Sequence, residues 1–200
     1  ALIGADPKTS GKVFLRGKEL NIHGPADAVD AGIGYLSEDR KRFGLLLIQD
    51  VTFNIALSSL KKFTNKFGFF KKSPAVVIAK EGIKTLGIKT PSERQLLKNL
   101  SGGNQQKVVI AKWLAKDCEV LIFDEPTRGI DVGAKDEIYK LLTKLASQGK
   151  SIIMISSELP EVLRMSDRIA VMCEGRLTGI IENKDADQNS IMQLATKFRD

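Results

Sequence analysis

Short apolar runs alternate with amphipathic stretches in the second half of the chain, and this alternation limits the possible folds more than any other feature. Residues 120–124, 151–156 and 168–172 have the composition of strands, while residues 135–146 and 159–165 have helical spacing. Strands that are separated by helices are joined by crossovers, which produce parallel sheets. We therefore expect an α/β protein whose strands at 120–124 and 151–156 are buried.

The remaining chain predicts two kinds of structure. Further strands are expected at residues 13–16, 34–36 and 176–181, the last as a hairpin partner, and helices at 26–31, 51–60, 75–86, 103–115 and 189–198. Residues 51–115 carry little strand signal, so we expect a helical insertion in a sheet-containing core. The predicted division assigns residues 1–45 and 116–183 to the α/β core, 46–115 to a helical subdomain and 184–200 to a helical tail.

Composition excludes several classes of protein. Of the 200 residues, 42% are hydrophobic, which is too many for a chain that is mainly disordered. No apolar run is long enough to span a bilayer. A single histidine and two cysteines 55 positions apart (Cys118 and Cys173) leave little for a zinc site or a Ser-His-Asp triad. The net charge of +7 permits nucleic acid, anionic lipid or phosphate ligands without selecting one.

The segment Leu-Ser-Gly-Gly-Asn-Gln-Gln-Lys at residues 100–107 predicts an anion site. Two glycines after a serine, at the start of a helix, leave backbone N–H groups uncovered by side chains. We expect Ser101 to cap this helix and, with Gly102, Gly103 and Asn104, to bind a nucleotide phosphate. The alternative is an ordinary serine N-cap followed by a turn.

A second motif, Val-Leu-Ile-Phe-Asp-Glu at residues 120–125, predicts a phosphate-associated metal site. A buried strand holds Asp124 at its carboxyl end, where it can bind Mg²⁺ on nucleotide phosphates, and Glu125 can polarise an attacking water. Arg-Gly-Ile-Asp at 128–131 predicts a tight turn that brings Asp131 near. The alternative is a pair of exposed acids that end a strand.

Together these motifs resemble the ATP-binding-cassette ATPases, and within them the carbohydrate importers of the ribose, galactose and xylose type. Residues 100–105 resemble the ABC signature, 120–126 the Walker B motif and 128–131 the D-loop. Three features resemble the carbohydrate-importer subgroup: Tyr-Leu-Ser-Glu-Asp-Arg-Lys at 35–41, Asn104 in place of glutamine, and Ser-Ser-Glu-Leu-Pro-Glu at 156–161. The resemblance covers nearly the whole chain and implies a P-loop NTPase-like fold. It is strongest with the second cassette of a two-cassette chain.

The sequence departs from the family pattern at three places. It contains no G-x-x-x-x-G-K-[S/T] phosphate loop, so we interpret it as a fragment that begins inside its cassette. The resemblance places Ser157 at the catalytic switch-histidine position and Glu38 at the Q-loop glutamine, where Glu38 can contact a nucleotide and its Mg²⁺. These changes predict a weak hydrolytic site, while the signature completes the site of a partner cassette.

The resemblance implies an ATPase subunit that couples ATP binding and hydrolysis to bacterial sugar uptake, with ATP and Mg²⁺ as cofactors. This chain alone is expected to bind MgATP poorly and to hydrolyse essentially none. The implied partners are a second cassette paired head to tail, a membrane permease and, indirectly, a periplasmic sugar-binding protein, without nucleic acid. The implied location is peripheral, on the cytoplasmic face of the inner membrane. The alternatives are a non-transport ATPase acting on nucleic acid or ribosomes, or a catalytically silent interaction module.

Residues 61–72 leave three interpretations open. Five lysines are interleaved with Phe63, Phe67, Phe69 and Phe70. The aromatic side chains can pack beneath a loop of the helical lobe, face a membrane or another subunit, or stack on nucleic-acid bases.

Overall fold

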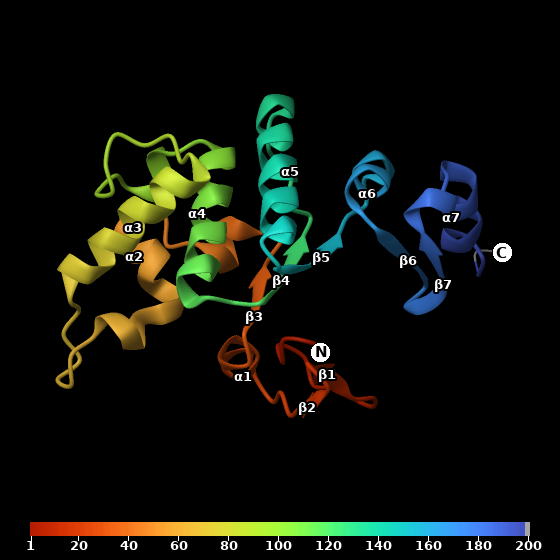
Figure 1. The fold of residues 1–200 in the computed structure, drawn as a ribbon, viewed down its shortest axis with the longest axis horizontal. Coiled ribbons are helices and arrows are strands. Elements are labelled where there is room, and N and C mark those ends of the chain that lie inside the picture. Colours follow the sequence, from red (N-terminus) through yellow and green to blue (C-terminus); the bar gives the residue numbers. More distant parts are fainter. Residues whose placement is uncertain (199–200) are drawn as a thin grey trace. The chain divides into compact units, whose positions relative to one another are not determined.

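The computed structural model describes residues 1–198, and the chain divides into two compact units, Ala1–Ile153 and Met154–Asp200 (Figure 1). The strands are β1 (Val13–Leu15), β2 (Lys18–Leu20), β3 (Ile33–Leu36), β4 (Val120–Asp124), β5 (Ser151–Ile155), β6 (Arg168–Cys173) and β7 (Arg176–Glu182). The α-helices are α1 (Pro25–Asp30), α2 (Val51–Ala56), α3 (Lys72–Leu86), α4 (Gly102–Lys116), α5 (Val132–Ser147), α6 (Leu159–Met165) and α7 (Gln188–Ala195). The predicted elements are thus present, with shifted ends.

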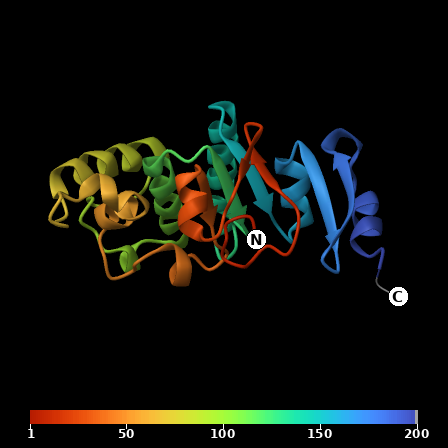
Figure 2. The same cartoon turned by 90° about the horizontal axis from the view of Figure 1, so that it is seen from below.

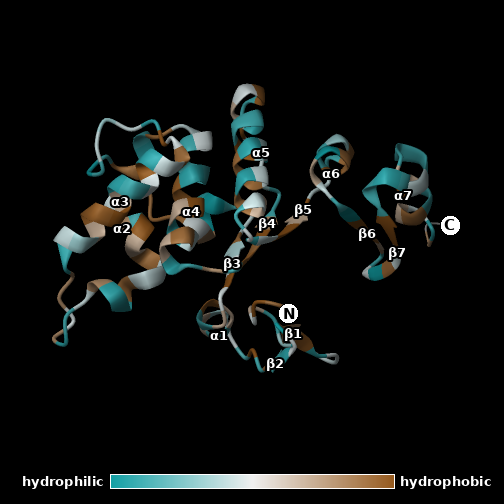
Figure 3. Ribbon diagram, in the orientation of Figure 1, coloured by the Kyte–Doolittle hydropathy of each residue, from teal (hydrophilic) through white to brown (hydrophobic). Residues whose placement is uncertain are grey.

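The central sheet has the strand order β3-β4-β5, and β3 runs parallel to β4 with Tyr35 opposite Ile122. Leu121 and Phe123 are fully buried, which confirms the prediction for the first apolar run. The prediction that β5 is buried is wrong for one face. Ile153 and Ile155 are 44% and 48% exposed, although β5 is strongly hydrophobic (Figure 3). Alternate side chains of a strand point to opposite faces, so one face of β5 is open to solvent.

Strand β6 does not belong to the parallel sheet, contrary to the expectation from the alternating pattern. It pairs antiparallel with β7 in a separate two-stranded sheet. Buried and exposed residues alternate strictly along β6, so only one of its faces is buried. In the second unit, Ile169 and Val171 on the buried face of β6 pack against Ile191 of α7. This packing removes the buried face of the hairpin from solvent. The predicted hairpin is confirmed.

Helices α2, α3 and α4 pack against one another as a helical layer in the first unit (Figure 2). Asp50 caps α2 by accepting a hydrogen bond from the N–H of Phe53 at 2.7 Å. The expected helix at 51–60 is shorter: α2 ends at Ala56, and a 3-10 helix, Leu57–Phe63, follows it, in which Ser59 leaves helical geometry. None of the described helices is both long and apolar enough to cross a membrane.

Two elements had no clear sequence signal. Strand β2 pairs antiparallel with β1 across a two-residue turn in which Arg16 and Gly17 both have positive φ. A short π-helix, Arg40–Gly44, follows β3, and Asp39 begins it by accepting a hydrogen bond from the N–H of Arg42. Both are short and lack the apolar periodicity that reveals longer elements.

Candidate functional site

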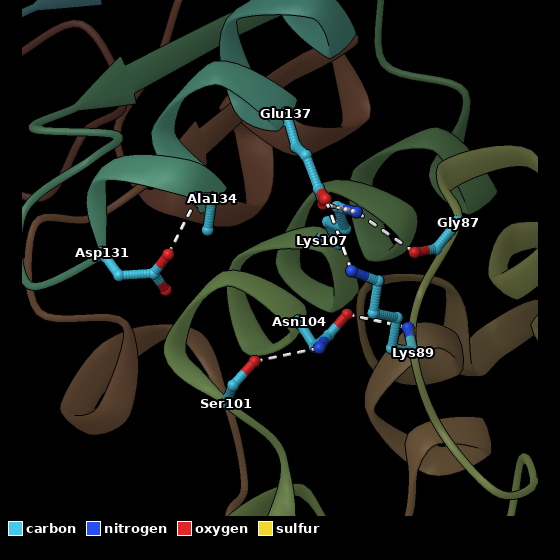
Figure 4. Close-up of polar contacts among 8 residues, drawn as sticks. All are labelled: Gly87, Lys89, Ser101, Asn104, Lys107, Asp131, Ala134 and Glu137. Atoms are coloured by element: carbon cyan, nitrogen blue, oxygen red, sulfur yellow. Dashed lines mark hydrogen bonds and ion pairs between the residues drawn. The ribbon is translucent and has the colours of Figure 1, made fainter.

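The glycine pair lies at the start of α4, as the sequence predicts, and Gly103 is buried there. Ser101 is the N-cap residue, but its side chain makes no capping hydrogen bond, so that part of the prediction is wrong. Its hydroxyl instead accepts a hydrogen bond from Nδ2 of Asn104 at 2.9 Å (Figure 4). The first N–H groups of an α-helix have no partner within the helix. The first turn of α4 therefore offers donors to an external anion.

Close packing fixes this helix start against the Asp131 turn. A Cβ atom on Gly102 would lie 2.8 Å from Nη2 of Arg40, and one on Gly103 would lie 2.9 Å from Cβ of Ala134. Arg40 is itself buried and donates a hydrogen bond of 3.1 Å to the Arg128 carbonyl. Desolvation lowers the pKa of the Arg40 guanidinium. The fold thus brings the glycine pair directly against the residues that begin α5.

The predicted tight turn at 128–131 is present. The N–H of Ile130 donates to the Thr127 carbonyl at 3.2 Å, and Gly129 has a φ of +67°. Asp131 ends the turn as the N-cap of α5, and its Oδ1 accepts a hydrogen bond from the N–H of Ala134 at 2.9 Å. Its carboxylate therefore holds the start of α5 in place.

An open pocket of about 310 Å³ lies where α4 and α5 begin (Figure 4). Its lining residues are Lys89, Ser101, Gly103, Asn104, Asp131, Gly133, Ala134 and Glu137. Of the predicted nucleotide-binding residues, Ser101, Gly103, Asn104 and Asp131 thus share one pocket, and Gly102 lies in the same turn. The pocket contains a cation, a hydroxyl and two helix starts, which suit a phosphate group, together with the carboxylates of Asp131 and Glu137.

Sequence reasoning assigned no role to three charged residues at this pocket, Lys89, Lys107 and Glu137. The buried amine of Lys107 donates to Glu137 at 2.7 Å and to the Gly87 carbonyl at 3.1 Å. This hydrogen bond and the charge of Lys107 lower the pKa of Glu137. The Lys89 amine lies 3.5 Å from Glu137, and the Lys89 N–H donates to Oδ1 of Asn104 at 2.7 Å. Two lysines thus offset the Glu137 charge, and Lys89 orients Asn104.

The acidic end of β4 is held by hydrogen bonds and ion pairs. Asp124 is the last residue of β4, and its Oδ2 accepts a hydrogen bond of 2.6 Å from the Tyr35 hydroxyl. Burial, and then this hydrogen bond, raise the pKa of Tyr35 to about 12. Glu38, exposed after β3, forms an ion pair with Arg128. Glu125 has a φ of +48°, and its backbone carbonyl begins the turn by accepting a hydrogen bond from the Arg128 N–H.

The predicted magnesium ligands do not form a metal site by themselves. Asp124 is engaged by Tyr35 and Glu38 by Arg128. Within residues 1–198 there is no group of three His, Cys, Asp or Glu side chains that could hold a metal ion. The metal role of Asp124 and Glu38 stays a prediction. Ser157 is exposed between β5 and α6 in the second unit, and its predicted switch role also stays untested.

The chain is similar to import ATP-binding proteins over nearly its whole length. An import ATP-binding protein of Burkholderia lata, named for ribose, galactose or methyl galactoside, is 59% identical over 98% of the chain. The ribose import ATP-binding protein RbsA of Clostridium perfringens is 55% identical over 97%. The chain spans only 38% and 39% of the length of these two relatives.

Two solved structures have the same fold. MJ1267, an ATP-binding cassette of an ABC transporter, aligns with 96% of the chain at a TM-score of 0.80 and 18% identity, and 79% of MJ1267 is covered. The dimeric cassette MJ0796, solved with ADP and phosphate, aligns with 89% at a TM-score of 0.72, and 75% of it is covered. The expected cassette fold is confirmed. The ABC transporter family profile matches residues 1–128, and the chain therefore belongs to the ABC transporter family.

Proposed function

We propose that this chain is part of the ATP-binding subunit of a bacterial importer for sugars such as ribose, galactose or xylose. The pocket at the starts of α4 and α5 carries the proposal, because it gathers Ser101, Gly103, Asn104 and Asp131 around one opening. The identity of 59% and 55% to import ATP-binding proteins supports the sugar class. The proposed division keeps 1–45 and 116–183 as core, 46–115 as helical subdomain and 184–200 as tail.

In this proposal the pocket binds the terminal phosphate of an ATP molecule whose other end is held by a partner cassette. The Ser101 hydroxyl and the N–H groups of the first turn of α4 donate hydrogen bonds to phosphate oxygens, and the helix dipole favours negative charge there. Lys89 fixes the Asn104 amide through a 2.7 Å hydrogen bond, and Asn104 in turn fixes Ser101. These donors need no reorganisation when ATP binds, which favours closure of the two cassettes.

The acids of β4 have separate proposed roles. Glu125 polarises the attacking water, Asp124 and Glu38 face the nucleotide-bound Mg²⁺, and Ser157 occupies the switch position with no charge to contribute. Tyr35 keeps Asp124 oriented through its 2.6 Å hydrogen bond. The proposed partners are a second cassette, a membrane permease and, indirectly, a periplasmic sugar-binding protein. The proposed location is the cytoplasmic face of the inner membrane.

A chimera tests this function. The chain replaces the matching segment of the C. perfringens RbsA protein, and ATP-dependent ribose uptake is measured in cells that retain the other importer parts. We expect uptake with the chimera and a loss of at least about tenfold with Ser101→Arg, which fills the pocket and displaces the hydroxyl.

Ser73→Arg, an exposed substitution in α3, is the matched control and leaves uptake unchanged. Equal uptake with both variants would overturn the role of the pocket. A chimera that folds and reaches the membrane but supports no uptake would overturn the sugar-import function.

A further inference from the structure

The loop between the 3-10 helix Leu57–Phe63 and α3 has an unusual surface. It extends away from the packed helices of the first unit (lower left in Figure 1). Phe67 and Phe69 at its tip are 74% and 71% exposed. Exposed phenylalanine is costly in water, and two such residues two positions apart form a small apolar tip.

The four phenylalanines of this loop have two different roles. Phe63 is buried, and the ring of Phe70 lies 6.5 Å from the Phe63 ring and 5.6 Å from the Phe53 ring, centroid to centroid. This cluster anchors the base of the loop in the helical lobe. Phe67 and Phe69 are not needed for that packing, because both remain largely exposed.

Hydrogen bonds order the tip. Oδ1 of Asn65 accepts from the N–H groups of both Phe67 and Phe69 at 2.9 Å, and the N–H of Asn65 donates to the Phe69 carbonyl at 2.9 Å. Gly68 between them has a φ of +83°, which a side chain would oppose. A bridge between Thr64 and Phe70 closes the base. The two rings are therefore presented by a preformed turn, and binding through them loses little conformational entropy.

The charge around this tip is entirely positive. Residues 61–72 contain five lysines and no acidic residue. Lys61 and Lys62 act electrostatically on Asp30 and Asp117, so their charge is partly balanced within the protein. Lys66, Lys71 and Lys72 flank the tip and are exposed. Apolar rings surrounded by lysines match the interface of an anionic bilayer, where rings enter the acyl boundary and amines contact headgroups.

We propose that the tip of residues 64–72 binds the surface of an anionic lipid bilayer. Phe67 and Phe69 insert, and Lys66, Lys71 and Lys72 contact lipid phosphates. Nucleic acid is the less suitable ligand, because Lys66 lies over the Phe67 ring at 5.3 Å from its centroid and covers a face on which a base would stack. A projecting turn also provides no groove that could follow a nucleic-acid backbone. This proposal does not depend on the sugar-import function.

Vesicle co-sedimentation of the 200-residue chain tests the proposal. We expect binding to vesicles that contain phosphatidylglycerol and little binding to pure phosphatidylcholine. Removing three lysines in K66Q/K71Q/K72Q lowers the partition coefficient by at least about tenfold. Raising the salt concentration also lowers the partition coefficient of the parent chain. The F67S/F69S variant lowers it by about tenfold or more, because the inserted apolar surface is lost.

Matched controls change the same residue types elsewhere in the first unit. Phe14→Ser removes another exposed phenylalanine, in β1, and K8Q/K18Q removes two exposed lysines. Both controls keep the partition coefficient within about twofold of the parent. Circular dichroism checks that every variant is folded.

Insertion has its own measurement. In F69W, the new tryptophan is quenched by brominated phosphatidylglycerol vesicles, whereas the buried Trp113 is not. Three results would overturn the proposal: unchanged binding by F67S/F69S, equal binding to uncharged vesicles, or tighter binding of the tip to single-stranded RNA than to vesicles.

Discussion

The Tyr35 hydroxyl donates a 2.6 Å hydrogen bond to Asp124, and this contact joins the end of β3 to the acidic end of β4. The two strands are parallel neighbours, so both side chains emerge at the same edge of the sheet. The short distance is typical of a hydroxyl that donates to a carboxylate. Tyr35 thereby fixes the orientation of the acid to which the sequence assigns a metal role.

Tyr35→Phe should lower the free energy of unfolding by about 1–2 kcal/mol at pH 7, because Asp124 loses its donor. The pKa of Tyr35 is raised to about 12 from the ordinary 10.0. Because the pKa is raised in the folded state, the protonated Tyr35 hydroxyl stabilises the fold fully below pH 10. This stabilisation is lost as the pH rises through about 12. Urea unfolding of both proteins between pH 7 and 12 measures the difference.

A double-mutant cycle provides the control for this contact. If Tyr35 acts through Asp124, Tyr35→Phe should cost little in an Asp124→Ala background, which has no acceptor, and the coupling energy should exceed about 0.5 kcal/mol. Additive effects would mean that the phenol stabilises the fold in another way.

Gly103→Ala should destabilise the chain by about 1–3 kcal/mol, because its Cβ would lie 2.9 Å from the Ala134 Cβ on a neighbouring helix. Gly102→Ala should also destabilise the chain, since its Cβ would lie 2.8 Å from Nη2 of the buried Arg40 and 3.2 Å from the Gly129 carbonyl oxygen. Thermal unfolding monitored by circular dichroism compares the variants.

Gly133→Ala is the matched control for the glycine prediction. It also lies at a helix start, but its new Cβ would meet only Oδ1 of Asp131, at an ordinary 3.5 Å. Alanine favours a helix over glycine by about 0.5–1 kcal/mol, so this variant should be neutral or more stable. Equal destabilisation at positions 103 and 133 would contradict the packing argument.

Lys112 is a buried amine that donates a 2.8 Å hydrogen bond to the Gly44 carbonyl. Desolvation lowers its pKa to about 8 from 10.5, so the charged form is disfavoured in the folded state. This penalty is complete below pH 8 and disappears as the pH rises towards 10.5. The free energy of unfolding should therefore increase between pH 8 and pH 10.5 by about 3 kcal/mol at most. The Lys112→Met protein should not show this increase.

Trp113 provides a second measurement for Lys112. It is the only tryptophan in the chain, and the Lys112 amine lies 4.7 Å from its ring centroid. Loss of the Lys112 charge should change Trp113 fluorescence with a midpoint near pH 8. The Lys112→Met protein should lack this step, and an unchanged midpoint in that variant would assign the titration to another group.

The chain by itself should bind MgATP weakly and hydrolyse essentially none. It has no phosphate loop. The pocket beside Ser101 offers hydrogen-bond donors to the terminal phosphate of ATP only. Isothermal titration should give a Kd of about 1 mM or weaker, near the limit for a few exposed hydrogen bonds. A Kd near about 1 μM would contradict this view and would require a phosphate cradle that the sequence does not contain.

The sequence predicted best where one local pattern determined the structure. The apolar run before Asp124 and the Gly102–Gly103 pair each specify their element regardless of distant contacts. It predicted less where burial depends on neighbours. Nothing in β5 itself shows that Ile153 would remain exposed, because strand composition cannot report what covers a face.

The same limit applied to the pocket. Lys89 and Glu137 come from segments far from the signature in sequence, and only the fold brings them beside Asn104. The Ser101 hydroxyl was expected to cap its helix, but the Asn104 amide three residues later supplies a donor for it. Competition between such side-chain and backbone partners is decided by local geometry that spacing does not encode.

The close contact between Gly103 and Ala134 also restricts which substitutions the protein can tolerate at these two positions. Enlarging either residue alone forces α4 and α5 apart and disturbs the pocket that both helices build. The two positions are thus expected to tolerate larger residues only when both change. A library randomised at both should return small residues as a pair, with glycine at position 103 whenever alanine occupies position 134.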